Sequence, residues 1–447
     1  MRKIIASLAI AGLLMLGGTA FAEIGAIDSV PAATLLLPYF EVSADGSVDT
    51  LFSINNASAA PALAHVTLWT DLSRPTLDFD VYLTGYDVVT LSLANLFING
   101  AIPQTGPNFT APGDVPFDVP SPNAPGEFSD ADVNFPGCAF PLPANIPASL
   151  LAYIQNLHSG GAAPNGFANS GLCGGVDYGD GAYRGYVTID IVNECSLEFP
   201  GNAAYIADGG TGIMANDNVL WGDYFYADSN ADFAQGDQLV HIEATGSVGG
   251  GFWAPGDYTF YGRYVSYDGS DNREPLATSW AARYFAGTLG VFTEPSDVIC
   301  WRDTGRNENG FFACGSAVAG NVAVTPFPLS QNQIVIFDEN ENPVVVEGSP
   351  FSPPPTLDST NPCPYEATRA SAADFGTIFD FGWFYMNLNT TTGSLVDPIK
   401  QSFVTSVHQA DGRFSVGYQA IHLDSALDKT FTVTTAPSDV SLPVADD

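Results

Sequence analysis

The sequence predicts a mainly β protein, built as one antiparallel β-sandwich or two packed sandwiches, with few short helices and long loops rich in proline and glycine. Apolar and polar residues alternate with a period of two in many short segments. Turn-forming residues separate these segments, since the 447 residues include 45 Gly and 32 Pro. Helical spacing is rare. Packed antiparallel sheets, each with one buried face, would explain this pattern.

Period-two alternation defines the predicted strands. Between residues 187 and 191, Val187, Ile189 and Ile191 share one face of an extended chain. Thr188 and Asp190 share the other face, which we expect to meet water. The same alternation predicts strands at 51–54, 65–69, 79–83, 89–93, 258–265, 334–337 and 414–418.

Two segments have the spacing of a helix. Between 148 and 158, four apolar residues fall on one side and Gly160 follows the last of them, as is typical of a helix C-terminus. A shorter helix is predicted over 278–285.

The length allows two or three domains, yet no clear linker separates them. We expect an N-terminal β-sandwich region over 23–145, a central β-rich region over 146–347, and C-terminal strands over 348–447 that could complete a sandwich. The loop-rich stretches 103–145, 160–183 and 348–364 are either domain boundaries or surface loops. We find no repeat of fixed period, which argues against propellers and solenoids.

Residues 1–22 have the pattern of a cleaved signal peptide. Arg2 and Lys3 precede a mostly apolar run over 4–16, and Ala20 and Ala22 form a small-x-small cleavage site. No later stretch approaches the roughly 18 apolar residues of a spanning helix. We therefore expect an exported protein, periplasmic or extracellular, with no membrane span.

Cysteine usage agrees with export. An even number of cysteines in an oxidising compartment predicts disulfides, and their spacing does not suggest a zinc site. We expect Cys300 to pair with Cys314 across a hairpin, Cys138 with Cys173, and Cys195 with Cys363. The six cysteines are Cys138, Cys173, Cys195, Cys300, Cys314 and Cys363.

Charge limits the partners. With 13 Lys and Arg against 49 Asp and Glu, the formal net charge is −36. Such a surface repels nucleic acids and anionic lipids, and attracts cations. The acids also keep a protein soluble when they are simply spread over its surface.

No catalytic motif stands out. The chain contains no G-x-S-x-G elbow, no H-E-x-x-H helix, no P-loop and no dinucleotide fingerprint. The five histidines show no ligand spacing. A site assembled from distant loops would leave no such signature. The sequence therefore favours a protein without enzymatic activity and identifies no catalytic residue.

Several segments resemble a group of uncharacterised exported bacterial proteins that are rich in β-structure. The segments are LLLPYFEV, TLFSINNAS, AHVTLWTD and LDFDVYLTGYDV near the N-terminus, and DNVLWGDYFYAD, GDYTFYGRY and FGWFYMNLN later in the chain. The resemblance implies export and β-structure but no activity, and it transfers no functional residue.

An acidic turn is a candidate calcium site. Asp228, Asn230 and Asp232 offer oxygen ligands at alternate positions, and Asp237 follows. The pattern departs from a helix-loop-helix calcium loop, because Phe233 stands where that loop needs glycine and Leu239 where it needs glutamate. A polar turn between two strands would show the same residues.

The segment LWGDYFYAD, residues 220–228, precedes this turn and is a candidate ligand platform. Alternation places Leu220, Gly222, Tyr224 and Tyr226 on one face, and Trp221, Asp223, Phe225 and Ala227 on the other. Aromatic rings beside carboxylates suit sugar binding, although aromatic residues in strands more often serve packing. The candidate platform residues are Trp221, Asp223 and Phe225.

Three classes of function fit the sequence. The first is an exported structural or adhesive protein that contacts polysaccharide or other cell-surface components. The second is a calcium- or carbohydrate-binding module. The third is a secreted polysaccharide hydrolase, which needs two carboxylates about 5–10 Å apart in a groove lined by Trp221, Trp253 or Trp280.

Overall fold

The chain folds into antiparallel sheets. The computed structural model describes residues 29–103, 145–202, 204–206, 212–247, 250–251, 253–287, 294–303, 311–314, 317–318, 321–322, 327–329, 333–345, 362–375, 379–388, 401–409, 415–419 and 421–425. Every strand pairing within them is antiparallel. The predicted mainly β, antiparallel fold is confirmed. The predicted signal peptide lies outside the described residues.

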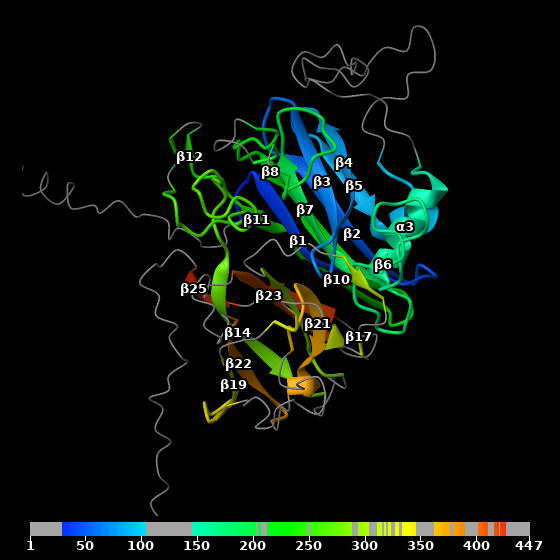
Figure 1. The fold of residues 1–447 in the computed structure, drawn as a ribbon. Helices are drawn as coiled ribbons and strands as arrows, with labels where there is room; N and C mark the ends of the chain where they lie inside the picture. The colour runs from blue at the N-terminus through cyan, green and yellow to red at the C-terminus, as the bar shows by residue number, and fades with distance from the viewer. Residues whose placement is uncertain are drawn as a thin grey trace, which may run out of the picture.

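Two sheets form the half of the molecule drawn in blue to green in Figure 1. The first has the order β11-β1-β7-β3-β4 and the second β10-β9-β2-β5, with β8 also paired to β2. The strands of the first sheet are β1 (Thr34–Val42), β3 (Ala62–Thr70), β4 (Pro75–Leu83), β7 (Tyr183–Ile191) and β11 (Val240–Ile242). Those of the second are β2 (Val48–Asn56), β5 (Val88–Ser92), β8 (Leu220–Trp221), β9 (Asp223–Asp228) and β10 (Phe233–Gln238).

Two further sheets form the other half, where most of the later strands lie (Figure 1). Their orders are β20-β19-β22-β14-β25 and β21-β15-β23-β24. The former contains β14 (Ala277–Phe285), β19 (Gln333–Asp338), β20 (Pro343–Val345), β22 (Phe381–Asn387) and β25 (Ile421–Ser425). The latter contains β15 (Asp297–Arg302), β21 (Ala367–Ser371), β23 (Ser402–Gln409) and β24 (Ser415–Gln419).

Small two-stranded sheets and short helices complete the described fold. The pairs are β6 (Leu172–Cys173) with β16 (Phe312–Ala313), β12 (Gly246–Ser247) with β13 (Gly250–Gly251), and β17 (Ala317–Val318) with β18 (Asn321–Val322). The helices are α2 (Leu93–Asn99), α3 (Ala148–His158) and the 3₁₀ turn η1 (Ala372–Phe375). No helix in the described ranges is long and apolar enough to cross a membrane.

All four large sheets contribute to one hydrophobic core. It includes Leu36 of β1, Phe52 of β2, Trp280 of β14 and Val404 of β23, all at most 2% exposed. The arrangement of the sheets as sandwiches, and the domain boundaries at residues 145 and 347, stay predictions.

One of the two predicted helices is present and the other is a strand. The helix over 148–158 is confirmed as α3. The helix over 278–285 is wrong, because this segment is strand β14, paired with β22 and β25. Trp280, Ala282 and Tyr284 are buried at alternate positions, so the segment carried a period-two signal.

The strand predicted over 258–265 is also wrong, because the segment makes successive turns. Gly262 N–H donates to Thr259 C=O, and Tyr264 N–H donates to Tyr261 C=O. Its polar side chains point into the molecule, where the Tyr261 hydroxyl donates to Asp190 at 2.9 Å. These side-chain bonds replace the ladder that the alternation had suggested.

The polar face predicted for 187–191 is buried, and not solvated. Asp190 is 0% exposed and accepts hydrogen bonds from the Tyr205 hydroxyl at 2.8 Å and from Tyr261. On the neighbouring strand, His65 bonds Asp80 at 2.8 Å. Loop segments therefore cover the second face of this sheet, and its polar residues bond to them.

The three predicted cysteine pairings are wrong, although disulfides are present. Cys300 pairs with Cys363, and Cys173 pairs with Cys314. Strand pairing explains both bonds. β15 pairs with β21, which follows Cys363, and Phe312 of β16 lies opposite Cys173 of β6. Cys195 is also disulfide-bonded, and Cys138 lies outside the described residues.

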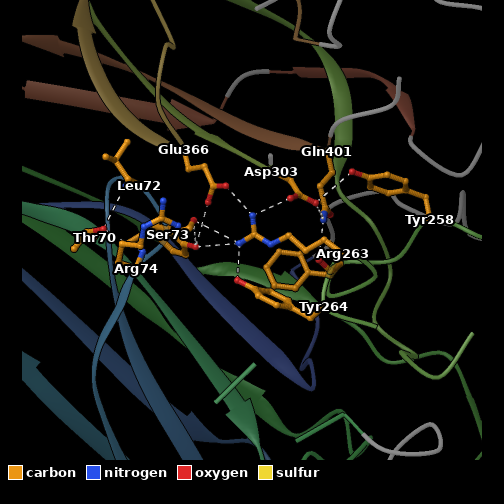
Figure 2. A network of polar contacts seen from close by, with 12 residues as sticks. Thr70, Leu72, Ser73, Arg74, Tyr258, Arg263, Tyr264, Asp303, Glu366 and Gln401 are labelled. Carbon is orange, nitrogen blue, oxygen red and sulfur yellow. Dashed lines mark hydrogen bonds and ion pairs between the residues drawn. The ribbon is translucent and has the colours of Figure 1, made fainter. Parts of the chain in front are cut away.

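A buried polar cluster ties the two halves together, as Figure 2 shows. Arg263 donates to Asp303 at 3.0 Å and to Glu366 at 2.7 Å, and these side chains are at most 5% exposed. Arg263 also lies within 3.4 Å of Ser73 and of the Tyr186 hydroxyl. Ser73 and Tyr186 come from the first sheet or its turns, whereas Asp303 and Glu366 flank β15 and β21. We call Ser73, Tyr186, Arg263, Asp303 and Glu366 the junction network.

Candidate functional site on the outer face of β9

The two faces of β8 and β9 differ as their alternation predicts. Leu220, Tyr224 and Tyr226 are at most 5% exposed and belong to the core. On the opposite face Phe225 is 50% exposed, and Trp221 and Asp223 are half-buried. We call Trp221, Asp223 and Phe225 the outer platform.

Apolar neighbours extend the outer platform. Leu51 of β2 lies directly opposite Phe225 and is 37% exposed. Val88 and Trp221 flank Asn55 on either side of β2, and Val88 is 59% exposed. Exposed apolar side chains that are grouped among polar ones are typical of interaction surfaces.

Gly236 of β10 provides space for the Phe225 ring. It lies opposite Phe225 in the ladder, and a Cβ added there would come within 2.6 Å of the Phe225 ring. The ring therefore lies across the glycine, which fixes its position on the sheet surface.

Fixed polar groups stand between the aromatic rings. The Ser53 hydroxyl donates to Asp223 Oδ1 at 2.5 Å, and the Asn55 amide donates to Ser53 Oγ at 3.1 Å. This chain of bonds orients a carboxylate, a hydroxyl and an amide on one strip of the sheet. Ser53 is 7% exposed and its hydroxyl also accepts the Asp223 backbone N–H, so it serves to hold the other two groups. The Asp223 carboxylate and the Asn55 amide can bond ligand hydroxyls while the flanking rings contact the apolar faces of a sugar.

The acidic turn lies at the end of the same face. A hollow of about 400 Å³ is lined by Asp49, Leu51, Asp228, Asp232 and Phe233, among others. Leu51 belongs both to this hollow and to the edge of the outer platform. The two sites predicted from the sequence are therefore neighbours.

The four predicted calcium ligands do not come together. Asp228 Oδ1 accepts the backbone N–H groups of Asn230 and Ala231, as in a polar turn. Asp237 pairs with Tyr224, so it lies well up the hairpin and on the opposite side of the sheet from Phe225. Among the residues that the structure describes, no three acidic, histidine or cysteine side chains are grouped so as to hold a metal. Calcium binding stays a prediction that rests on Asp228, Asn230 and Asp232.

Two of the three tryptophans named for a hydrolase groove are buried. Trp280 is 0% exposed and Trp253 is 7% exposed, so both are packing residues. Only Trp221 of the three reaches the surface.

Sequence reasoning missed Leu51, Val88 and Gly236. The alternation of 51–54 placed Leu51 on a definite face, but the pairing of β2 with β9 was needed to place it beside Phe225. Comparison of the chain with protein family models, curated proteins and solved structures found no match.

Proposed function

We propose that this protein is an exported adhesive protein that binds polysaccharide through the outer platform. The observation that supports this proposal most strongly is the exposure of Phe225 beside Leu51, with the Asp223–Ser53–Asn55 strip next to them. Phe225 is grouped with exposed Leu51 and half-buried Trp221, and a group of exposed apolar side chains indicates an interaction surface where a single one does not.

The surface suits a long polymer more than a small molecule. It is an open sheet face, which offers contacts to several sugar rings in line and encloses none of them. Affinity would come from two or three aromatic and apolar contacts, as is usual for binding surfaces.

Export supports an extracellular target. The chain contains at least two disulfides, which persist in oxidising compartments. The signal peptide predicted over 1–22 would deliver it there.

The test is depletion of the purified protein by insoluble polysaccharides such as cellulose, chitin and xylan. We expect the wild type to be retained by at least one of them, and Phe225→Ser and Trp221→Ala to weaken retention about tenfold each. Phe381→Ser is the matched control, because Phe381 is 39% exposed on β22, a strand of a different sheet. Equal loss in Phe225→Ser and Phe381→Ser, or no retention of the wild type, would refute the proposal.

A further inference from the structure

A second cavity lies between the two halves of the molecule. Its volume is about 390 Å³, within the usual range for small-molecule sites. Strand β1 contacts both β15 and β21 in this region. The lining residues are Tyr39, Glu41, Tyr178, Arg184, Asp297, Arg369, Ala370 and Ser371.

Each half contributes one cross-strand ion pair to the cavity. Glu41 of β1 lies opposite Arg184 of β7, and their side chains meet at 2.9 Å. On β15 and β21, Arg369 binds Asp297 at 2.6 Å. Because each pair is anchored on its own sheet, the polar groups are held in place before any ligand arrives.

The pair of Arg369 and Asp297 keeps unused hydrogen-bonding capacity. Arg369 directs Nε and Nη2 to a single oxygen, Asp297 Oδ2. Within the described part of the chain, Arg369 Nη1 and Asp297 Oδ1 make no further hydrogen bond. Arg369 can thus still donate through Nη1 and Asp297 can still accept through Oδ1, which suits a ligand whose hydroxyl groups accept and donate.

Tyrosines shape the rest of the cavity. The Tyr39 hydroxyl donates to Glu41 Oε2 at 2.8 Å. Burial, and then the charge of Glu41, raise the pKa of Tyr39, so that hydroxyl keeps its proton. Tyr178 is 43% exposed, and the guanidinium of Arg184 lies 4.7 Å from the centre of its ring. Its exposed part offers an apolar surface for C–H groups.

The charges around the cavity disfavour ionic ligands. Arg184 also binds Asp180 at 2.6 Å, so three carboxylates surround two guanidinium groups. An anion would meet these carboxylates, and a cation would meet Arg184 and Arg369. A neutral ligand rich in hydroxyl groups avoids both costs.

We propose that this cavity is a saccharide-binding site that takes a neutral sugar residue, with adjacent hydroxyls bonded to Arg369 and Asp297. This inference rests on the proposed function for the class of ligand, because the cavity and the outer platform would then both bind saccharides. The cavity would select the sugar, whereas the outer platform would hold the polymer.

The test is binding of monosaccharides to the full chain, measured by saturation-transfer NMR and calorimetry. The probes are glucose, galactose, mannose and N-acetylglucosamine, with glucuronate and glucosamine as charged analogues. We expect a neutral sugar to bind, and its charged analogues to bind more weakly. Asp297→Asn should weaken that binding about 10- to 100-fold.

A second variant separates blocked binding from misfolding. Ser371 is half-buried, lines the cavity and lies opposite Asp297, on the same face of β21 as Arg369, so Ser371→Trp should fill the space and abolish binding while both ion pairs remain. Arg283→Gln is the control, because Arg283 forms an exposed ion pair with Glu339 elsewhere. It should leave sugar binding unchanged.

Three results would overturn the inference: no neutral sugar binds, glucuronate binds most tightly, or folded Ser371→Trp binds as the wild type does. The retention of Phe225→Ser on insoluble polysaccharide is measured separately. If retention depends on Phe225 but no monosaccharide binds, this inference fails and the proposed function survives. If Ser371→Trp loses sugar binding but Phe225→Ser is retained like the wild type, the outer platform is refuted and the cavity site stands.

Discussion

The junction network and the outer platform both contain acidic side chains, but the two regions differ in how far those side chains are exposed to water. At the junction, the side chains of Arg263, Asp303 and Glu366 are at most 5% exposed and bond to one another. At the outer platform, Asp223 is half-buried and Phe225 is 50% exposed. Buried charges must be paired, because nothing else replaces their hydration. Half-exposed groups can exchange water for a ligand.

In a chain with so many acidic residues, the exposure of a side chain therefore indicates whether it serves stability or binding. Loss of a junction side chain should cost stability, and loss of a platform side chain should cost binding.

Arg263→Met should have the largest effect on stability. It leaves Asp303 and Glu366 buried without their guanidinium, and breaking such a pair costs about 5 kcal/mol. Urea unfolding measures the change. Arg283→Met is the control, since its ion pair is 63% and 37% exposed, and it should cost less than about 1 kcal/mol. Similar losses in both variants would contradict the division.

Loss of the disulfide between Cys300 and Cys363 should have the second-largest effect on stability. Cys300 and Cys363 are 63 residues apart, and a loop of that length corresponds to about 4 kcal/mol of chain entropy. Arg302 Nη1 also donates to the carbonyl of Cys363 at 2.7 Å, which places the bond near the junction. The double variant Cys300→Ser, Cys363→Ser should therefore unfold at a lower urea concentration. An unchanged midpoint would show that the bond is dispensable.

Acid should destabilise the interior through His158. Burial lowers the pKa of His158 from 6.5 to about 4, and its ring bonds Thr76 and the carbonyl of Arg184. Between these two pKa values the unfolded chain binds a proton that the folded chain does not. Stability is therefore fully present above pH 6.5 and falls towards pH 4, by about 3 kcal/mol for this group.

The comparison of wild type with His158→Gln isolates that contribution. Buried Asp71 has a pKa raised to about 7 by burial, so it acts in the opposite direction in both proteins and cancels in the difference. The gap between the two unfolding free energies should narrow as the pH falls from 7 to 4. A constant gap would refute the assignment.

Gly236→Ala should weaken binding by moving the Phe225 ring on the outer face. The new methyl group would displace the Phe225 ring without removing any ligand-contacting side chain. It would also come within 2.9 Å of the Tyr224 carbonyl oxygen, so the unfolding free energy should fall by about 1 kcal/mol. Retention on polysaccharide should fall several-fold. Undiminished retention would mean that the position of the Phe225 ring does not matter.

Added calcium should change the unfolding free energy least. Asp228 already bonds the backbone of its own turn, and Asp237 lies elsewhere. A site with a Kd of about 1 mM would gain about 0.4 kcal/mol at 1 mM calcium. Thermal melting with calcium or EDTA measures it, and Asp232→Asn is the matched variant. A shift of several degrees that survives in Asp232→Asn would place the calcium site elsewhere.

Local patterns predicted much of this fold. Alternation placed Phe225 outside and Tyr224 inside before any pairing was known, because strand geometry alone sets that choice. The helix over 148–158 was also predictable, since its apolar spacing and the glycine after it are local signals.

Long-range contacts were not predictable in this way. Cys300 meets Cys363 because β15 pairs with β21, a contact that no spacing encodes. The burial of Asp190 depends on Tyr205 and Tyr261 from later loops. The cavity between Arg184 and Arg369 likewise exists only once the two halves are in contact.

The most direct test measures Phe225→Ser and Glu366→Gln side by side, for unfolding free energy and for retention on the same polysaccharide. We expect opposite effects from the two variants. Phe225→Ser should unfold like the wild type but be poorly retained. Glu366→Gln should be destabilised but be retained normally while it is folded. If Phe225→Ser is destabilised and Glu366→Gln alone loses retention, the assignment of binding to the outer platform is contradicted.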